Sequence, residues 1–488
     1  MKIFNIISAA LFAILSVFAN FANAQDVKPV KYVFLFIGDG MGAGEREMAD
    51  EYSRATFRRP LLCDTIGRPT PTATRSANAE VTDSAAGGTA LACGEKVNNG
   101  VLGISPDGRK LHSAANIAKD SGKKVGIIST VMANHATPAA FYAHQNSRSS
   151  MYDIALELVD TNFDYFGGGG IQLYDDKKSP NYRGSIYDLA KKAGYKVVVE
   201  DPAAFAALKP SDGKVLAFGS IDSALPPRFE RIARKSAEPT LADYVAKAVE
   251  LLDCDKGFFI MAEGGQIDWF CHGNDIGYAI GETVDFDDAV GVAYEFAQKH
   301  PNETLIIVTA DHETGGLTTG YKSSDFKIDV SKVSLQKASL ESINSEIKKL
   351  AKMKGKDFTF ETAAEVVEKK IGLKFSGSPE DSMTLLPAEI EVLRKLFDIQ
   401  FKGAKAATEK KLTDKEALDN KYEIYKTGKK AFMTGIGQCF ARRLGAEWTT
   451  GGHTSTDIIT TACGKNSELF GKKIDNTDIG KIIKASVK

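Results

Sequence analysis

Four apolar runs in the chain each end at polar residues. The runs are 31–37, 124–130, 257–261 and 304–309. A short, nearly continuous apolar run is typical of a strand buried on both faces of a parallel sheet. Helical stretches such as 111–121 and 281–299 lie between the runs. This alternation predicts an α/β fold, a three-layer sandwich in which helices flank a large, mainly parallel central sheet.

The polar residues that follow the runs are expected at one edge of this sheet. In chain order they are Asp39, then His135 and Thr137, then Glu263, then Asp311 and His312. In open sheets of this kind, ligands bind beyond the carboxyl ends of the strands. Asp268 and His272 follow Glu263 at a spacing of i, i+4, so a helix would place them on one face. We therefore expect these side chains to share one site.

The pattern changes between about residues 321 and 434. This segment is Lys-rich and helical, and it separates His312 from a Gly-Gly-His motif that ends at His453. It predicts a helix-rich insertion that packs over or beside the active edge. Its lysines are expected to form a solvated helical face.

The first residues of the chain predict a secretory signal peptide over 1–24. A single Lys precedes an apolar stretch over 3–21, and Ala22-Asn23-Ala24 has the small-x-small form of a cleavage site. An uncleaved membrane anchor is the alternative. No later segment is long and apolar enough to span a bilayer. We expect an exported protein, periplasmic or secreted, with a single α/β domain over 25–488.

Composition restricts the range of partners. The chain has 488 residues, with 62 basic and 63 acidic side chains and a formal net charge of −1. No basic stripe is present, so a nucleic-acid partner is not expected. The six cysteines lack the spacing of a zinc finger, and an oxidising compartment would permit up to three disulfides among them.

The residue types at the predicted edge favour metal chemistry. Mixed imidazole and carboxylate ligands suit zinc, whereas carboxylates with hydroxyl groups and water suit magnesium. Ser84 opens a run of small residues and could lie at a helix N-terminus, where backbone N–H groups favour anions, or could simply cap that helix. A serine needs a base or a metal to act as a nucleophile. Arg148 could clamp a phosphate through two hydrogen bonds or could be a surface residue.

Six motifs, taken in their order and spacing, give the chain a resemblance to a known family. They are DGMG, VTDSAAGGTA, HATPAAFYAH, EGGQID, ADHETGG and GGHTS, and they extend from Asp39 to His453. The chain resembles the alkaline phosphatases, the metal-dependent phosphoserine-type phosphomonoesterases, in their bacterial secreted form.

The resemblance implies two Zn²⁺ ions and one Mg²⁺ ion. The first zinc site would be Asp268, His272 and His453; the second would be Asp39, Asp311 and His312; the magnesium site would be Asp39, Thr137 and Glu263. Ser84 would be the nucleophile that becomes phosphoserine. Arg148 would hold two phosphate oxygens, and Asp83 would orient Arg148.

Two positions depart from the pattern of the bacterial prototype. His135 stands where that pattern has an Asp beside magnesium, and in having a His there the chain resembles the animal enzymes. Trp269 stands where the pattern has a Lys or a His. A neutral imidazole at His135 would weaken the hold on magnesium. Trp269 would either speed phosphate release, because a potential cation is lost, or only pack against the insertion.

The predicted function is hydrolysis of phosphate monoesters to an alcohol and inorganic phosphate, for phosphate scavenging. Alternatives of the same fold are a phosphodiesterase or a sulfatase, although Ser84 lacks the Cys maturation motif of sulfatases. A non-catalytic phosphate-binding protein is an alternative from another class. The family resemblance also makes a homodimer an expectation to be tested.

Overall fold

A ten-stranded sheet forms the centre of the molecule. The computed structural model describes residues 27–320, 327–402 and 431–488, so the predicted signal peptide lies outside the described residues. The strand order is β14-β2-β13-β8-β1-β7-β3-β4-β6-β5. The pairs from β8 to β5 are parallel, whereas β13 runs antiparallel to both β8 and β2.

The strands of the main sheet are β1 (Tyr32–Gly38), β2 (Thr70–Ala73), β3 (Lys124–Met132), β4 (Tyr165–Gly169), β5 (Tyr195–Val199), β6 (Lys214–Phe218), β7 (Phe258–Gly264), β8 (Thr304–Thr309), β13 (Ile458–Gly464) and β14 (Ile474–Asp475). Two-stranded ribbons pair β9 (Glu313–Thr314) with β12 (His453–Thr454) and β10 (Thr318–Thr319) with β11 (Ala446–Glu447). The four predicted strand runs correspond to β1, β3, β7 and β8.

The helices up to residue 299 are α2 (Ala43–Phe57), α3 (Leu62–Thr65), α4 (Ser84–Cys93), α5 (Ala114–Asp120), α6 (Ala136–Ala139), α7 (Met151–Asp160), α8 (Ile186–Lys192), α9 (Pro202–Ala206), η2 (Pro210–Asp212), α10 (Arg228–Arg234), α11 (Leu241–Leu252), α12 (Gln266–His272) and α13 (Ile276–Lys299). The later helices are η4 (Val330–Leu335), α14 (Leu340–Lys354), η5 (Gly355–Asp357), α15 (Phe360–Ile371), α16 (Pro387–Phe401), α18 (Ala431–Arg443), η7 (Ser467–Leu469) and α19 (Asn476–Ser486). The predicted helices at 111–121 and 281–299 correspond to α5 and α13.

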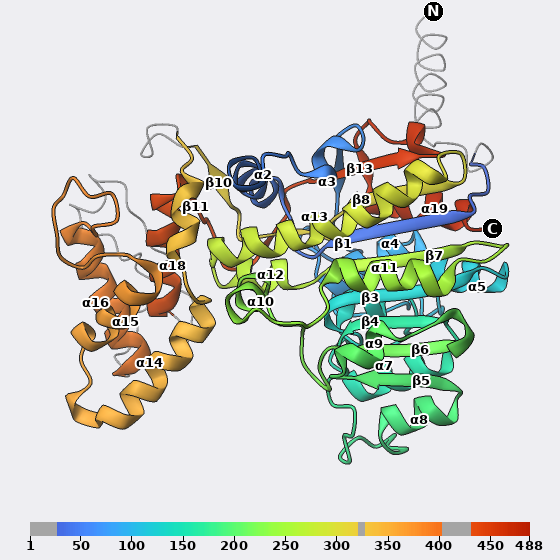
Figure 1. Ribbon diagram of the computed structural model, residues 1–488, viewed down its shortest axis with the longest axis horizontal. Helices are drawn as coiled ribbons and strands as arrows, with labels where there is room; N and C mark the ends of the chain where they lie inside the picture. The colour runs from blue at the N-terminus through green and yellow to red at the C-terminus, as the bar shows by residue number, and fades with distance from the viewer. Residues whose placement is uncertain (1–26, 321–326, 403–430) are drawn as a thin grey trace, which may run out of the picture.

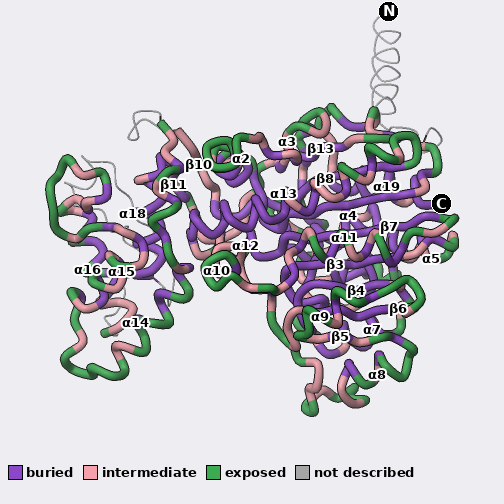
Figure 2. The backbone as a smooth tube through the Cα atoms, viewed as in Figure 1, coloured by how far each residue is buried: buried purple, intermediate pink, exposed green. Residues whose placement is uncertain are grey.

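The two faces of β1 belong to two separate hydrophobic cores. Tyr32, Phe34 and Phe36 point into a core that includes α11 and α13. The alternate residues Val33 and Leu35 point into a second core that includes α4, α5, α7 and α19. Because successive side chains of a strand point to opposite faces, a strand buried on both sides must be apolar throughout. Figures 1 and 2 show this buried sheet between its helical layers, which confirms the predicted three-layer α/β fold.

The helices α14, α15, α16 and α18 lie together beside the sheet, in orange and red at the left of Figure 1. We call the described residues 330–402 and 431–443 the helical segment. Its interior is aromatic, with Phe360, Phe397 and Phe432 in mutual edge-on contact. This segment includes most of the predicted helix-rich insertion, and α18 continues past residue 434 to Arg443.

All six cysteines lie in the described residues, and all are free thiols. The disulfides that an oxidising compartment would permit are therefore absent from the structure. Across residues 27–320, 327–402 and 431–488, no helix is both long enough and apolar enough to cross a membrane.

Candidate active site

The carboxyl edge of the sheet brings the predicted ligand residues together. Within the described residues, three groups of side chains hold ligand atoms within 4.8 Å of one another: Asp268 with His312 and His453, Asp39 with Asp311 and His312, and Asp39 with His135 and Glu263. Four consecutive parallel strands of the sheet, β8, β1, β7 and β3, place their carboxyl ends at the same edge. The expected shared site is thus a single cluster.

His312 and Ser84 face each other at the centre of this cluster. His312 Nε2 lies 3.4 Å from Asp39 Oδ1 and 3.4 Å from Asp311 Oδ2. The same nitrogen lies 3.2 Å from Ser84 Oγ. His312 and both aspartates are completely buried.

A second set of ligand-type side chains borders His312 on the other side. His272 Nε2 lies 3.2 Å from His453 Nε2 and 3.3 Å from Asp268 Oδ2. The His453 ring stacks on that of His312, with the centroids 3.6 Å apart. The β9–β12 ribbon delivers His453, because His453 pairs with Thr314 two residues after His312.

Main-chain carbonyls orient two of these imidazoles. His272 Nδ1 donates to the Gly451 carbonyl at 2.7 Å, and His453 Nδ1 donates to the Thr82 carbonyl at 2.9 Å. In the neutral imidazole each bond keeps the proton on Nδ1, so that Nε2, directed into the cluster, can bind a metal. Sequence reasoning missed these partners because a main-chain carbonyl has no residue-type signature.

Glu263, His135 and Thr137 lie close to Asp39. Thr137 Oγ1 donates to Asp39 Oδ2 at 3.3 Å. The Glu263 carboxylate accepts a short hydrogen bond from the Ser129 hydroxyl, a partner that the sequence did not reveal. Thr314 was also missed: its hydroxyl donates to Asp268 Oδ1 at 2.6 Å, and the only sequence signal for it is its place in the ADHETGG motif.

Ser84 is the first residue of α4, and the N-cap of that helix is Asp83. The Asp83 side chain accepts from the Ala86 N–H, so the interpretation of Ser84 as the cap is wrong. The small residues after Ser84 let the helix approach the metal-ligand strand. A Cβ at Gly87 would lie 2.8 Å from the Asp311 carbonyl oxygen. The run of small residues therefore brings the serine and the N-terminus of the helix against the ligands.

Arg148 and Trp269 lie beside this cluster. Arg148 Nη1 pairs with Asp83 Oδ2 at 3.1 Å, and its Nη2 lies 3.4 Å from His135 Nε2. Trp269, on α12, is 38% exposed and meets the His135 ring edge-on, with the centroids 5.9 Å apart. All thirteen predicted site residues thus belong to one neighbourhood.

Burial and charge set the protonation states of the site. Burial raises the pKa of Glu263 to about 8 and that of Asp311 to about 6. Burial lowers the pKa of His312 and His453 to about 4, so both imidazoles are neutral at pH 7. For Asp268, burial favours the neutral acid, but the hydrogen bond and charge of His272 outweigh it and lower the pKa.

Several buried polar atoms of the site have no hydrogen-bond partner among the described residues. They are Asp39 Oδ1, Glu263 Oε1, Asp311 Oδ2 and His135 Nδ1. An unpaired buried carboxylate oxygen is costly unless a cation accompanies it. Neutral imidazoles and carboxylates in this arrangement therefore fit divalent metal ions.

Comparison with known proteins agrees with this geometry. A family model described as alkaline phosphatase matches residues 30–488. The chain belongs to the alkaline phosphatase family. It is a phosphatase, and the groups of ligand-type residues described above are consistent with the metal dependence expected from the sequence.

Individual alkaline phosphatases match along nearly the whole chain. Alkaline phosphatase 3 of Bacillus subtilis (strain 168) is 33% identical over 478 residues, covering 94% of this chain and 90% of the relative. The crystal structure of a cold-active alkaline phosphatase from a psychrophilic Shewanella has a TM-score of 0.71 at 25% identity, covering 94% of this chain and all of that one. A variant of the TAB5 alkaline phosphatase, solved with magnesium bound in its M3 site, has a TM-score of 0.62 at 26% identity, covering 94% of this chain and 99% of that one.

Proposed function

We propose that this alkaline phosphatase hydrolyses phosphate monoesters through a covalent phosphoserine on Ser84, with two Zn²⁺ ions and one Mg²⁺ ion as cofactors. The observation that carries the proposal is the position of Ser84 Oγ. It lies at the N-terminus of α4, 3.2 Å from His312 Nε2 and beside the ligand groups. A phosphate-binding protein would need neither a nucleophile nor this convergence of ligand side chains.

The proposed ligand sets overlap the three groups of ligand-type side chains, with His272 in place of His312 in the first set and Thr137 in place of His135 in the magnesium set. Asp268, His272 and His453 would hold the first zinc, and Asp39, Asp311 and His312 the second. Asp39, Thr137 and Glu263 would hold magnesium, and the magnesium in the M3 site of the TAB5 variant supports a third ion. When bound, the metals would activate the serine and stabilise charge on the entering and leaving oxygens.

The chain's own residues bind and orient the ester. The Arg148 guanidinium offers two parallel N–H donors to phosphate oxygens, and Asp83 fixes its orientation through Nη1. First, Ser84 Oγ bonds to phosphorus as the bond to the alcohol oxygen breaks. A water oxygen then bonds to phosphorus as the bond to Ser84 breaks, which releases phosphate. Two in-line displacements give overall retention at phosphorus.

His135 distinguishes the third site from a fully anionic one. Burial, with Arg148 nearby, lowers the pKa of His135 to about 4, so the imidazole is neutral at working pH. A neutral ligand in place of a carboxylate attracts a hard cation less strongly. We therefore propose that magnesium is held less tightly here than in a site with an aspartate at this position.

The proposal extends to the cellular setting of the enzyme. A signal peptide over 1–24 would direct the chain to the periplasm or the medium, where it would scavenge phosphate. The mature chain would be a single α/β domain over 25–488, with the helix-rich insertion at about 321–434. Nucleic acid would not be a partner, and both a monomer and a homodimer fit this proposal.

Ser84→Ala tests the reaction. Turnover of p-nitrophenyl phosphate should fall by a factor on the order of 10³ or more, because the nucleophile is removed. Bound zinc and binding of inorganic phosphate should persist. Ser53→Ala removes another buried helical serine, which bonds only the Arg59 carbonyl, and should leave turnover unchanged.

The same assay separates the alternatives. Wild-type protein that contains zinc but cleaves only diesters or sulfate esters would indicate a phosphodiesterase or a sulfatase. Wild-type protein that binds phosphate without turnover would indicate a binding protein. Full turnover in Ser84→Ala would contradict the covalent mechanism.

A further inference from the structure

The turn after α12 connects the His272 helix to the rest of the molecule through Asn274. Asn274 is completely buried and has a φ of +54°, in the left-handed region that asparagine tolerates better than most residues. The sequence analysis gave it no role. The structure places it two residues after His272 and next to Asp275, the N-cap of α13.

The Asn274 amide bridges three separate parts of the chain. Its Nδ2 donates to the Cys271 carbonyl at 3.1 Å, within α12, and to the Thr450 carbonyl at 3.0 Å. Its Oδ1 accepts from Gln438 Nε2 at 3.2 Å, and Gln438 lies on α18 of the helical segment. The amide therefore joins the helix of His272 to the loop that leads to His453.

The loop at Thr450 includes the carbonyl that orients His272. The next residue is Gly451, whose carbonyl accepts from His272 Nδ1 at 2.7 Å. The His272 side chain is 39% exposed, against 15% for His453 and 0% for His312. Packing constrains the His272 ring less than the other two, so its orientation depends more on that hydrogen bond.

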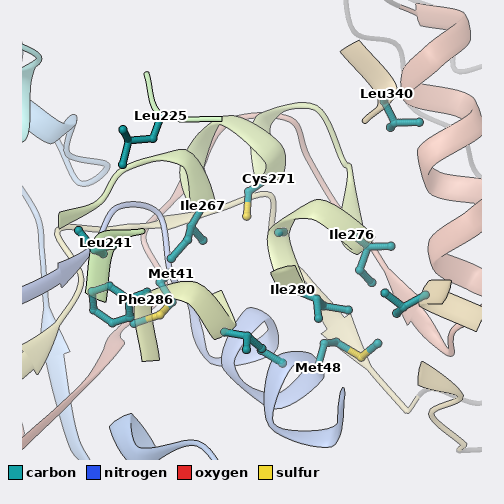
Figure 3. Packing of buried hydrophobic residues seen from close by; sticks show 14 of the residues in the cluster. Met41, Met48, Leu225, Leu241, Ile267, Cys271, Ile276, Ile280, Phe286 and Leu340 are labelled. Atoms are coloured by element: carbon teal, nitrogen blue, oxygen red, sulfur yellow. The ribbon is translucent and has the colours of Figure 1, made fainter. Parts of the chain in front are cut away.

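The helical segment supports this arrangement from behind. A Cβ at Gly437 would lie 2.4 Å from the Asn274 carbonyl oxygen, so α18 rests directly on the turn. Leu340 of α14 also lies against Gly437. Figure 3 shows Ile267 and Cys271 of α12 and Ile276 of α13 among the apolar side chains on the inner side of this turn. The buried amide adds polar connections to the apolar contacts of this region.

We propose that Asn274 is a positioning residue for the Asp268–His272–His453 metal site. It fixes the separation between α12 and the 449–453 loop, and so holds the His272 ring in the orientation that binds metal. The proposal rests on the zinc assignment of the proposed function. The hydrogen bonds of this amide described above go to Cys271, Thr450 and Gln438, so the Asp39–Asp311–His312 site should not depend on it.

Asn274→Gly is the test variant, because glycine keeps the left-handed backbone and removes only the amide. Zinc release into a chromogenic chelator, followed with zinc-loaded protein, reports metal retention without reference to turnover. One of the two zinc ions should leave the variant at least about tenfold faster than it leaves the wild type. Loss of a hydrogen-bond partner that supports a metal ligand typically has an effect of this size. Asn274→Asp, which keeps the acceptor for Gln438 but loses both donors, should behave similarly.

Asn466→Gly is the matched control. Asn466 is also buried, has a φ of +69°, and its amide donates to a main-chain carbonyl, that of Lys28, at 2.8 Å. It lies beside β13, away from the ligands. Its variant should lose thermal stability yet release zinc as the wild type does.

The possible results separate this inference from the proposed function. Release at the wild-type rate in Asn274→Gly would overturn the role of Asn274. So would equal acceleration in Asn466→Gly, or acceleration of both zinc ions in Asn274→Gly. Wild-type protein that binds no zinc would instead overturn the metal assignment itself.

Discussion

Trp269 is an uncharged residue beside the predicted active-site cluster. It follows Asp268 on α12, is 38% exposed, and touches the ring of His135. An indole offers no positive charge to a phosphate dianion, so Arg148 is the cation beside Ser84 that the structure identifies. Product phosphate should therefore dissociate more readily than from a site with an additional cation.

Trp269→Lys should make phosphate a tighter product inhibitor. A half-exposed ion pair contributes up to about 1 kcal/mol, so the inhibition constant should fall about fivefold. Inhibition of p-nitrophenyl phosphate turnover by inorganic phosphate measures it. Trp269→Phe keeps an uncharged aromatic side chain and should match the wild type. An unchanged constant in Trp269→Lys would refute this role.

At the scale of single residues, the sequence predicted the ionisable side chains that cluster at the sheet edge better than their hydrogen-bond partners. Asp311 and His312 were predictable because ionisable residues directly after a buried strand are unfavourable without a binding partner. The supports of the histidines are the carbonyls of Thr82 and Gly451, and any residue type provides a carbonyl. The role of Asn274 likewise depends on contacts that exist only after folding.

At the scale of secondary-structure elements, Asp275 joins α13 to the helical segment. Its carboxylate caps α13 and accepts from the Leu340 N–H and from Gln336 Nε2, both at 2.6 Å. Burial raises its pKa from 3.8 to about 6 despite these donors. The folded protein therefore retains a proton on Asp275 over a pH range in which the unfolded chain has lost it.

The pH dependence of stability should reveal this proton. A raised carboxyl pKa contributes stability below about pH 4 that is lost as pH rises through about 6. The difference between a pKa of 3.8 and one of about 6 corresponds to about 3 kcal/mol at 1.36 kcal/mol per pH unit. The Asp275→Asn variant has no carboxyl group to titrate at this position, so it does not lose this stability as pH rises. The unfolding free energy of the variant minus that of the wild type should therefore rise by about that amount between pH 4 and 7, in urea titrations with metal in excess. Parallel curves would contradict the prediction.

Long apolar elements were predictable, and short pairings were not. β1 is buried on both faces over seven residues, so its apolar run reveals it. The β9–β12 ribbon has two residues per strand and joins Thr314 to His453 across the helical segment. Two residues cannot show a periodicity, and their pairing is fixed by tertiary contacts.

At the scale of the whole molecule, the buried carboxylates make the fold dependent on cations. Asp39, Glu263 and Asp311 lie together at the sheet edge, and burial raises the pKa of each. Bound metal would stabilise their ionised forms and would thereby stabilise the folded chain. Without metal, like charges would oppose each other in the interior.

Removing the metals should reverse the pH dependence of stability between pH 6 and 9. In chelated protein, Glu263 with a pKa of about 8 contributes stability at low pH that is lost as pH rises, about 3 kcal/mol over this range. Metal-loaded protein should be more stable at pH 9, because binding requires deprotonated ligands. Calorimetric melting temperatures at both pH values, with and without chelator, measure this. A change of melting temperature with pH that has the same sign in both forms would refute the prediction. Adding zinc and magnesium back to the chelated protein should restore turnover.

His453 lies late in the sequence, so the site can be completed only late in the synthesis of the chain. The proposed ligands begin at Asp39 and would be complete only at His453, after the helical segment has been synthesised. A nascent chain still attached to the ribosome lacks one wall of the site, however well its first strands have folded. With the proposed ligand set, the order of translation would keep a half-made enzyme from hydrolysing esters in the compartment of synthesis.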